Sequence, residues 1–427
     1  MINGTILDVE SWSIYNLTCC RGCGSSELED LLNLGKSPVA NNFISADNDR
    51  EVESKFPLKL KVCSHCAFVQ LSEQLPREIL FNESYLYFSS YSSSWLDHSK
   101  IFANKMKKYL DLTTSSLVLE IASNDGYLLK FFKELGIQTL GIEPSANVAA
   151  IAIREGISTE VDFFSFSKSK QLAEELEKVD LIVVNNVLAH VPDIHDFISG
   201  ISQLVTLETV VSIEFPHLAN LMKFNQFDTV YHEHYSYLSV TSLLPIFNLY
   251  GLKVFYVENL DTHGGSLRLF VDSVASPRVV DKSVDETLSL EICYDPRILS
   301  NRTLLQQNVA KVRNDLIDEI TRIRREGKKI ALYGAAAKGN TLLNFCEIKK
   351  SDIEYAVDLN PNKQNLLLPG THIPVRDIIE LNNNPVDVIL ILPWNLGPEI
   401  NTQLKNYIEN SFVTFRAIPK IEYYLNE

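Results

Sequence analysis

The sequence predicts an α/β protein with three domains, and three observations support this prediction. Residues 117–144 follow the order strand, tight turn, helix and strand, with an acid after the second strand, as in Rossmann-like folds. Residues 329–358 repeat this pattern. Ahead of both, two Cys-x-x-Cys pairs mark a small N-terminal domain. We therefore place the domains at residues 1–75, 76–285 and 286–427.

The composition is that of a globular protein with room for several cores: 427 residues, 45% hydrophobic and 22% charged. A net charge of −15, with no block of Lys and Arg, argues against nucleic acid or an anionic membrane as a partner. We see no secretory leader and no apolar run of about 18 residues, so we expect a cytoplasmic protein. There, its seven cysteines should be thiols or metal ligands.

The two cysteine pairs predict a zinc site, because each spacing places two thiolates on one tight turn. The expected ligands are Cys20, Cys23, Cys63 and Cys66. Cys19 could replace Cys20, but the two-residue spacing and Gly22 favour Cys20. Four thiolates leave no position for water, so we expect a structural zinc ion. Buried free cysteines are the weaker alternative for two matched pairs.

The first Rossmann-like unit predicts a cofactor that contains a nucleoside. Its turn lets a ligand approach the helix N-terminus, and Glu143 can accept both hydroxyls of a ribose. Nicotinamide enzymes share this layout, but their G-x-G-x-x-G is absent. Glu120 at the end of the first strand and an Asn-Asp-Gly turn favour S-adenosylmethionine. The expected cofactor residues are Glu120, Ala122, Ser123, Asn124, Asp125, Gly126, Tyr127, Glu143, Pro144, Asn185 and Asn186.

Candidate catalytic side chains follow the later strands of this unit. His190 lies just past the fourth strand, at the edge where open α/β sheets bind ligands, although a lone histidine is as often structural. After the fifth strand, Tyr231, His232, Glu233 and His234 bring together groups suited to acid–base catalysis. His232 and His234 are two residues apart and lack the i, i+4 spacing of helical metal ligands. A solvated loop is the plain alternative.

The C-terminal third predicts a second Rossmann-like unit behind a long helix. The helical pattern runs from about residue 288 to 325, and the strand–turn–helix unit begins at residue 329. Its small-residue turn suits a diphosphate, since Lys338 adds a charge that backbone amides lack. Asp358 ends its next strand. A purely structural turn rich in Gly and Ala is the alternative.

Together, these segments resemble the S-adenosylmethionine-dependent sugar C-methyltransferases, which act on nucleotide-linked 4-keto-deoxysugars. The matching segments are residues 20–23, 63–66, 120–127, 186–192, 231–239 and 333–341. The resemblance implies a class I (Rossmann-like) methyltransferase domain between a zinc-binding domain and a C-terminal Rossmann-like domain. It also implies S-adenosylmethionine and structural zinc as cofactors, and a monomeric protein.

The same resemblance implies functional residues. The implied active site consists of Tyr85, His190, Tyr231, Glu233 and His234. The residues implied for the nucleotide sugar are Tyr87, Tyr333, Ala335, Lys338, Asn340 and Asp358. Tyr85 and Tyr87 belong to a stretch rich in Tyr and Ser, which packing at a domain boundary would also explain. The family usually has Gly where this chain has Ala122.

The implied reaction is methyl transfer to C3 of a nucleoside-diphospho-4-keto-6-deoxyhexose through an enolate, in deoxysugar biosynthesis for a surface polysaccharide or natural product. His234 is the expected base. Tyr231 and His190 are the expected donors to the developing oxyanion, and Glu233 is expected to orient an imidazole or a sugar hydroxyl. The alternatives are O- or N-methylation of a nucleotide sugar, a nicotinamide enzyme, and a non-catalytic cofactor-binding protein.

Overall fold

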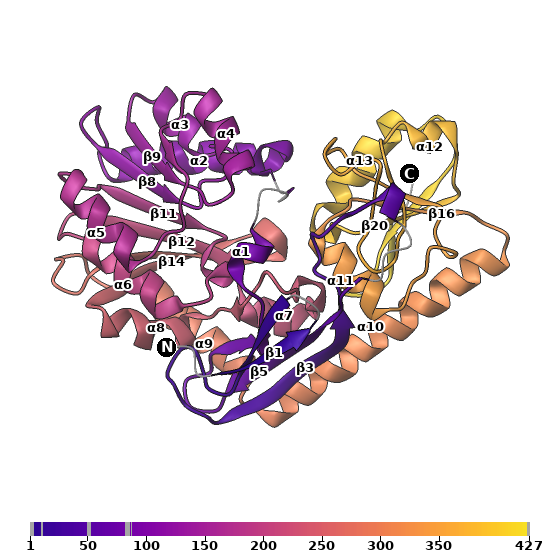
Figure 1. Ribbon diagram of the computed structural model, residues 1–427, viewed down its shortest axis with the longest axis horizontal. Helices are drawn as coiled ribbons and strands as arrows, with labels where there is room; N and C mark the ends of the chain where they lie inside the picture. The colour runs from indigo at the N-terminus through magenta and orange to yellow at the C-terminus, as the bar shows by residue number, and fades with distance from the viewer. Residues whose placement is uncertain (1–3, 10–11, 49–52, 82–85, 87, 425–427) are drawn as a thin grey trace.

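A computed structural model describes residues 4–9, 12–48, 53–81, 86 and 88–424 (Figure 1). Two α/β units stand side by side, with the N-terminal strands and the long helix α10 (Leu299–Arg325) along their lower edge. The predicted α/β class with two Rossmann-like units is confirmed. Among the residues described, no helix has both the length and the apolar character that a membrane crossing needs.

The N-terminal part is built from short antiparallel sheets. Its elements are β1 (Gly4–Val9), β2 (Trp12–Leu17), β3 (Leu28–Ser37), β4 (Ile44–Ser45), η1 (Ala46–Asn48), β5 (Phe56–Cys63), β6 (Val69–Leu71), β7 (Glu73–Gln74) and α1 (Arg77–Leu80). Alternate residues of β5 are buried, as expected for a sheet with one face on a core. The four-stranded sheet has the order β13-β6-β5-β3. Its strand β13 (Ser236–Tyr237) comes from the segment that carries the predicted catalytic cluster, which is thereby attached to the cysteine-containing part.

The central unit is a seven-stranded sheet in the order β10-β9-β8-β11-β12-β15-β14, parallel except for the β14–β15 hairpin. Its elements are η2 (Ser89–Tyr91), α2 (Ser93–Tyr109), β8 (Leu117–Ile121), α3 (Leu129–Glu134), β9 (Gln138–Ile142), α4 (Ala146–Arg154), β10 (Thr159–Glu160), α5 (Phe166–Glu175), β11 (Leu181–Asn185), η3 (Leu188–His190), α6 (Ile194–Leu204), β12 (Val210–Pro216), α7 (Leu218–Phe224), η4 (Phe227–Thr229), α8 (Val240–Leu249), β14 (Leu252–Leu260), η5 (Thr262–Gly264), β15 (Ser266–Ser273) and α9 (Lys282–Cys293). Every residue of β11 is buried, because helices cover both faces of the sheet.

The C-terminal unit has a six-stranded sheet in the order β19-β17-β16-β20-β21-β22. Its elements after α10 are β16 (Ile330–Tyr333), α11 (Ala337–Phe345), β17 (Tyr355–Val357), β18 (Leu366–Leu367), β19 (Val375–Arg376), α12 (Glu380–Asn383), β20 (Val388–Ile391), η6 (Trp394–Leu396), α13 (Gly397–Tyr407), β21 (Val413–Arg416) and β22 (Glu422–Tyr424). Side chains of α10, β3, β5 and β16 share one hydrophobic core, which joins this unit to the N-terminal sheet.

One predicted element is wrong. The expected helix from about 288 to 325 is two helices, α9 and α10, separated by residues 294–298. Pro296 explains the break, because the residue before a proline is driven out of the helical conformation and proline has no amide to donate.

Candidate functional site

The four predicted zinc ligands lie together at the ends of two loops of the N-terminal part. The Sγ atoms of Cys20 and Cys66 are 3.6 Å apart, as are those of Cys23 and Cys63. All four sulfurs lie within 4.8 Å of one another. Thiolates about 2.3 Å from a tetrahedral Zn²⁺ are about 3.8 Å apart, so the cluster has the size of a four-cysteine zinc site. The backbone carbonyl of Cys19, which is outside the cluster, accepts a hydrogen bond from Gln70.

The turn between β8 and α3 has three residues in left-handed conformations. Ala122, Asn124 and Gly126 have φ values of 54°, 52° and 78°. The turn brings the amide of Asn124 within 2.9 Å of Glu143 Oε2, while Oε1 accepts the amide of Ser145 at 2.8 Å. The carboxylate of Glu143 is thus fixed at the tip of β9, with lone pairs left for a ligand.

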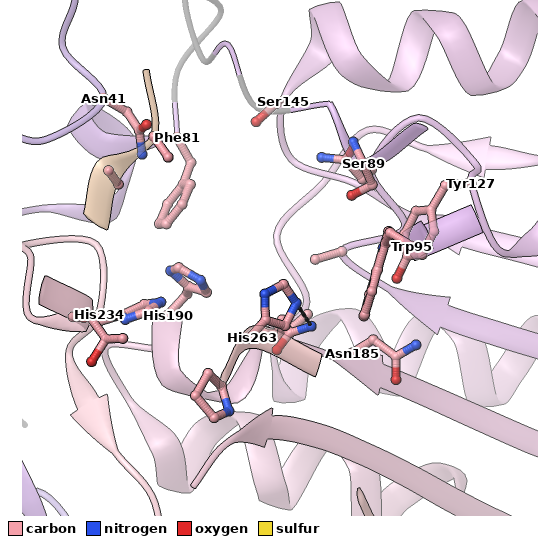
Figure 2. A pocket seen from close by; sticks show the side chains of 18 of the residues that line it. Asn41, Phe81, Ser89, Trp95, Tyr127, Ser145, Asn185, His190, His234 and His263 are labelled. Atoms are coloured by element: carbon pink, nitrogen blue, oxygen red, sulfur yellow. Dashed lines mark hydrogen bonds between the residues drawn. The ribbon is translucent and has the colours of Figure 1, made fainter. Parts of the chain in front are cut away.

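A cavity of about 590 Å³ begins at this turn and is lined by all three parts of the chain. Figure 2 shows Trp95, Tyr127, Asn185 and His263 at one end and His190 and His234 side by side at the other. The predicted cofactor residues that line it are Ala122, Asn124, Tyr127, Glu143, Pro144, Asn185 and Asn186. The side-chain oxygens of Asn185 and Asn186 are buried without a hydrogen-bond partner among the described residues. Such acceptors suit the ammonium and ribose hydroxyls of S-adenosylmethionine.

The other predicted cofactor residues support the turn from behind. Ser123 is fully buried, and Gly141 of β9 packs so closely on it that an added Cβ would lie 2.3 Å from its Oγ. Asp125 Oδ2 accepts the amide of Ser90 at 3.1 Å and its hydroxyl at 2.6 Å, which fastens η2 to the turn. Gly126 supplies a left-handed backbone. Glu120 is fully buried, and this burial raises the pKa of its carboxyl group well above the usual value.

The candidate catalytic histidines have well-defined tautomers. Nδ1 of His234 donates to the carbonyl of Thr229 at 2.9 Å, so Nε2 is the acceptor and takes the hydroxyl of Tyr231 at 2.8 Å. Nδ1 of His190 donates to the carbonyl of Glu233 at 2.7 Å, which leaves its Nε2 as an acceptor too. The ring centroids of the two histidines are 4.5 Å apart. Burial lowers the pKa of His190 to about 4 and that of His234 well below its usual value, so both rings are neutral near pH 7.

The side chain of Glu233 does not line the cavity. Its Oε1 accepts the backbone amide of Asn41 at 3.2 Å and the side-chain amide at 3.0 Å, and Asn41 itself borders the cavity. Burial raises the pKa of Glu233 to about 7. Its backbone carbonyl holds His190, so Glu233 acts on the cavity wall through its neighbours. His232 points away as well, with Nε2 donating to the carbonyl of Pro57.

Lys338 is the predicted nucleotide-sugar residue that lines the cavity. Its Nζ donates to the carbonyl of His263 at 3.1 Å. Tyr333, Ala335, Asn340 and Asp358 do not line the cavity. Asp358 accepts the amide of Ala335 at 2.7 Å, and Asn340 donates to the carbonyl of Ala40 at 2.6 Å. These side chains shape the turn before α11 and join it to the N-terminal part. Tyr85 and Tyr87 lie outside the described residues.

Sequence reasoning missed several residues of the cavity wall. Trp95 of α2 stacks on His98 and lies 5.1 Å from the ring of His263, which accepts the side-chain amide of Asn186 at 3.2 Å. Lys363, 8% exposed, donates to the carbonyl of Ala335 at 2.9 Å. The Gly264–Gly265 pair could have indicated that His263 lies in a closely packed part of the fold. A Cβ at Gly264 would collide with Trp394, and one at Gly265 would collide with Asn220.

Comparison with known proteins gives three family models that match in order along the chain. A "Putative zinc binding domain" matches residues 20–81, a "Methyltransferase domain" residues 98–257, and a "C-methyltransferase C-terminal domain" residues 261–419. The C-methyltransferase NovU of Streptomyces niveus is 32% identical over 401 residues, which are 94% of this chain and 95% of that protein. This chain belongs to the C-methyltransferase family.

Solved structures of other methyltransferases overlap part of this C-methyltransferase. Magnesium protoporphyrin IX methyltransferase of Synechocystis PCC 6803, with bound SAH, has 14% identity and a TM-score of 0.33, over 41% of this chain and 82% of that one. An SAM-dependent methyltransferase of Anabaena variabilis has 12% identity and a TM-score of 0.34, over 41% and 84%. The family assignment does not depend on these overlaps.

The family assignment decides between the alternatives for the cofactor. A C-methyltransferase with a methyltransferase domain over residues 98–257 uses S-adenosylmethionine, which excludes the nicotinamide alternative, and it is an enzyme, which excludes the non-catalytic one. The acceptors at the turn would hold the amino acid and ribose parts of the cofactor, and the four cysteines would hold zinc.

Proposed function

We propose that this C-methyltransferase transfers a methyl group to C3 of a nucleoside-diphospho-4-keto-6-deoxyhexose through an enolate, in deoxysugar biosynthesis for a surface polysaccharide or natural product. One observation carries the proposal: two neutral imidazoles, His190 and His234, lie 4.5 Å apart on the wall of the cavity that begins at the cofactor turn. A carbon must be made nucleophilic before it can accept a methyl group, and this requires a base.

A ketone beside the acceptor carbon would meet this requirement. A ketone at C4 makes the neighbouring C3–H bond acidic, because the charge left on carbon is delocalised onto the carbonyl oxygen. S-adenosylmethionine supplies an electrophilic methyl group when it is bound. The protein must therefore remove one proton and stabilise one oxyanion, and it must exclude water from the cavity meanwhile.

His234 is the proposed base. Its Nδ1–H is held by the carbonyl of Thr229, so a proton from C3 can only be taken at Nε2, where the hydroxyl of Tyr231 now donates. The hydroxyl of Tyr231 occupies the only lone pair of Nε2, so it must turn away before Nε2 can take the proton from C3, and it can then donate to the enolate oxygen. Proton removal and oxyanion stabilisation are coupled in this way. The negative enolate then compensates the imidazolium that burial otherwise disfavours.

For His190 we propose a role other than that of the oxyanion donor expected from the sequence. As a neutral ring with Nδ1–H on the carbonyl of Glu233, it offers the cavity an acceptor and no donor. We therefore propose that Nε2 of His190 accepts a hydrogen bond from a sugar hydroxyl. His190 is also the second candidate for the base.

The nucleotide is proposed to lie against the C-terminal unit. Lys338 lines the cavity near Ala336 and Ala337, whose backbone begins α11. A cation beside the N-terminus of a helix is a favourable position for a diphosphate. Trp394 supports Lys338, with the ammonium 5.3 Å from the ring centroid.

The proposal is tested by incubating the protein with S-adenosylmethionine and a panel of dTDP- and GDP-linked 4-keto-6-deoxyhexoses. The same sugars reduced to the 4-hydroxyl form are the matched controls. We expect a mass gain of one methyl group, located on C3 by fragmentation, with the keto sugars alone. A methyl group on oxygen or nitrogen, or equal turnover of the reduced sugars, would contradict the enolate mechanism.

A further inference from the structure

Arg21 connects the zinc site to both candidate catalytic histidines. It lies between the zinc ligands Cys20 and Cys23 in the sequence, and its guanidinium group reaches the central unit. Nη1 donates to the carbonyl of Val191 at 3.0 Å and to that of Pro192 at 2.9 Å. These two residues directly follow His190. One end of the guanidinium therefore fixes the His190 loop.

The other end of the guanidinium fixes the His234 loop. Nη2 donates to the carbonyl of Tyr235 and to the hydroxyl of Ser236, the latter at 2.6 Å. Tyr235 directly follows His234 in the sequence. A single planar group thus holds the residue after each histidine. Because the guanidinium group is rigid, a displacement of one loop is transmitted to the other.

The backbone at Arg21 is also fixed by hydrogen bonds. Its backbone amide donates to Gln70 Oε1 at 2.8 Å. Gln70 is fully buried in β6. Nε2 of His195 donates to the carbonyl of Gly22 at 2.9 Å, so the central unit also grips the backbone next to Arg21. Phe68 lies under the turn, 3.1 Å from where a Cβ on Gly22 would be.

We propose that Arg21 is a positioning residue, through which the zinc-bound turn fixes the placement of His190 relative to His234. The zinc ion then does more than stabilise the N-terminal part, because the turn that it closes carries the side chain that sets the geometry of the cavity wall. Displacements of about 1 Å between catalytic groups can reduce a rate by about 100-fold, so a link of this kind bears directly on turnover. The proposal rests on the proposed roles of the two histidines only for its effect on turnover.

The test compares Arg21→Gln with Arg297→Gln in full-length, zinc-loaded protein. Arg297 is the matched control, since it donates to the carbonyl of His65 inside the second cysteine turn and contacts neither histidine loop. All nine histidines are labelled with ¹³C at Cε1, and the signals of His190 and His234 are identified by substituting each with Gln. Zinc content and the calorimetric affinity for S-adenosylhomocysteine are measured in parallel.

We expect Arg21→Gln to shift the signals of both histidines, with zinc content retained and the affinity for S-adenosylhomocysteine unchanged within about two-fold. Arg297→Gln should shift neither signal. If the Gln variant fails to fold, Arg21→Lys serves instead: one ammonium group cannot reach both loops, so the same two signals should shift. With a substrate in hand, kcat should fall by about 10- to 100-fold and KM should change little.

Unchanged signals in a zinc-loaded Arg21 variant would overturn the proposal. Loss of zinc from both Arg21 variants would also overturn it, because Arg21 would then act on the stability of the turn and not on the histidines. The spectra require no substrate, so this outcome is distinguishable from a failure of the proposed sugar chemistry.

Discussion

The substitution Glu233→Gln should stabilise the protein at alkaline pH but not at acidic pH. Glu233 is 1% exposed, and burial raises its pKa from 4.5 to about 7. Its Oε1 accepts two hydrogen bonds from Asn41, whereas Oε2 has no partner among the described residues. Glutamine has the same shape, and its oxygen can keep the bonds to Asn41.

The magnitude follows from the pKa of the carboxyl group. A folded-state pKa above the unfolded one means that the folded protein holds a proton that the unfolded chain releases, so stability is lost as the pH rises from 4.5 to about 7. Each pH unit in this interval is worth about 1.4 kcal/mol, which gives about 3 kcal/mol as an upper estimate. Glutamine does not titrate and avoids this loss.

The assay is differential scanning calorimetry of wild type and variant at pH 5 and pH 8. We expect the melting temperature of Glu233→Gln to exceed that of the wild type by several degrees more at pH 8 than at pH 5. Glu208→Gln is the control, since it removes an equal charge from an exposed position. An equal difference at both pH values, or a larger one at pH 5, would refute the burial of an ionisable carboxyl at this position.

Three further predictions concern the cavity wall. Tyr231→Phe removes the hydroxyl that donates to Nε2 of His234 and should lower kcat by about 10²- to 10³-fold, without changing the calorimetric affinity for S-adenosylhomocysteine. Ala122→Gly relieves a left-handed alanine at φ 54° and should stabilise the protein by about 1 kcal/mol, seen as a higher melting temperature; no increase would argue against this backbone conformation. Lys338→Ala should raise KM for the nucleotide sugar by about 10-fold or more, with kcat largely retained. An unchanged KM would contradict binding of the diphosphate by Lys338.

The sequence was sufficient for the elements that are set by local pattern. Each apolar run has an acid at or near its end: Glu120 is the penultimate residue of β8, and Glu143 directly follows β9. Both strands and the turn between them could therefore be predicted closely. The cysteine spacing likewise predicted the sulfur cluster, because two residues between ligands already place both thiols on one turn. The α/β class, the cofactors and the family are confirmed.

Contacts between distant segments could not be predicted. Asp358 accepts the amide of Ala335, and Asn340 donates to the carbonyl of Ala40 in the N-terminal part. Neither contact can be predicted from the positions of these residues in the sequence. Trp95 has the helical period of a core residue, and its position at the cofactor end of the cavity depends on how α2 packs. The link from Arg21 to both histidine loops spans up to 215 positions in the chain and has no local signature.

The proposed enolate mechanism is tested most directly by proton exchange at C3. The keto sugar is incubated in D₂O with S-adenosylhomocysteine and with wild type, His234→Gln or His190→Gln protein, and deuterium at C3 is followed by mass spectrometry. We predict exchange with the wild type, slower exchange with His190→Gln, and none above background with His234→Gln. Exchange at the wild-type rate in His234→Gln would contradict the assignment of the base, and no exchange in the wild type would contradict the enolate.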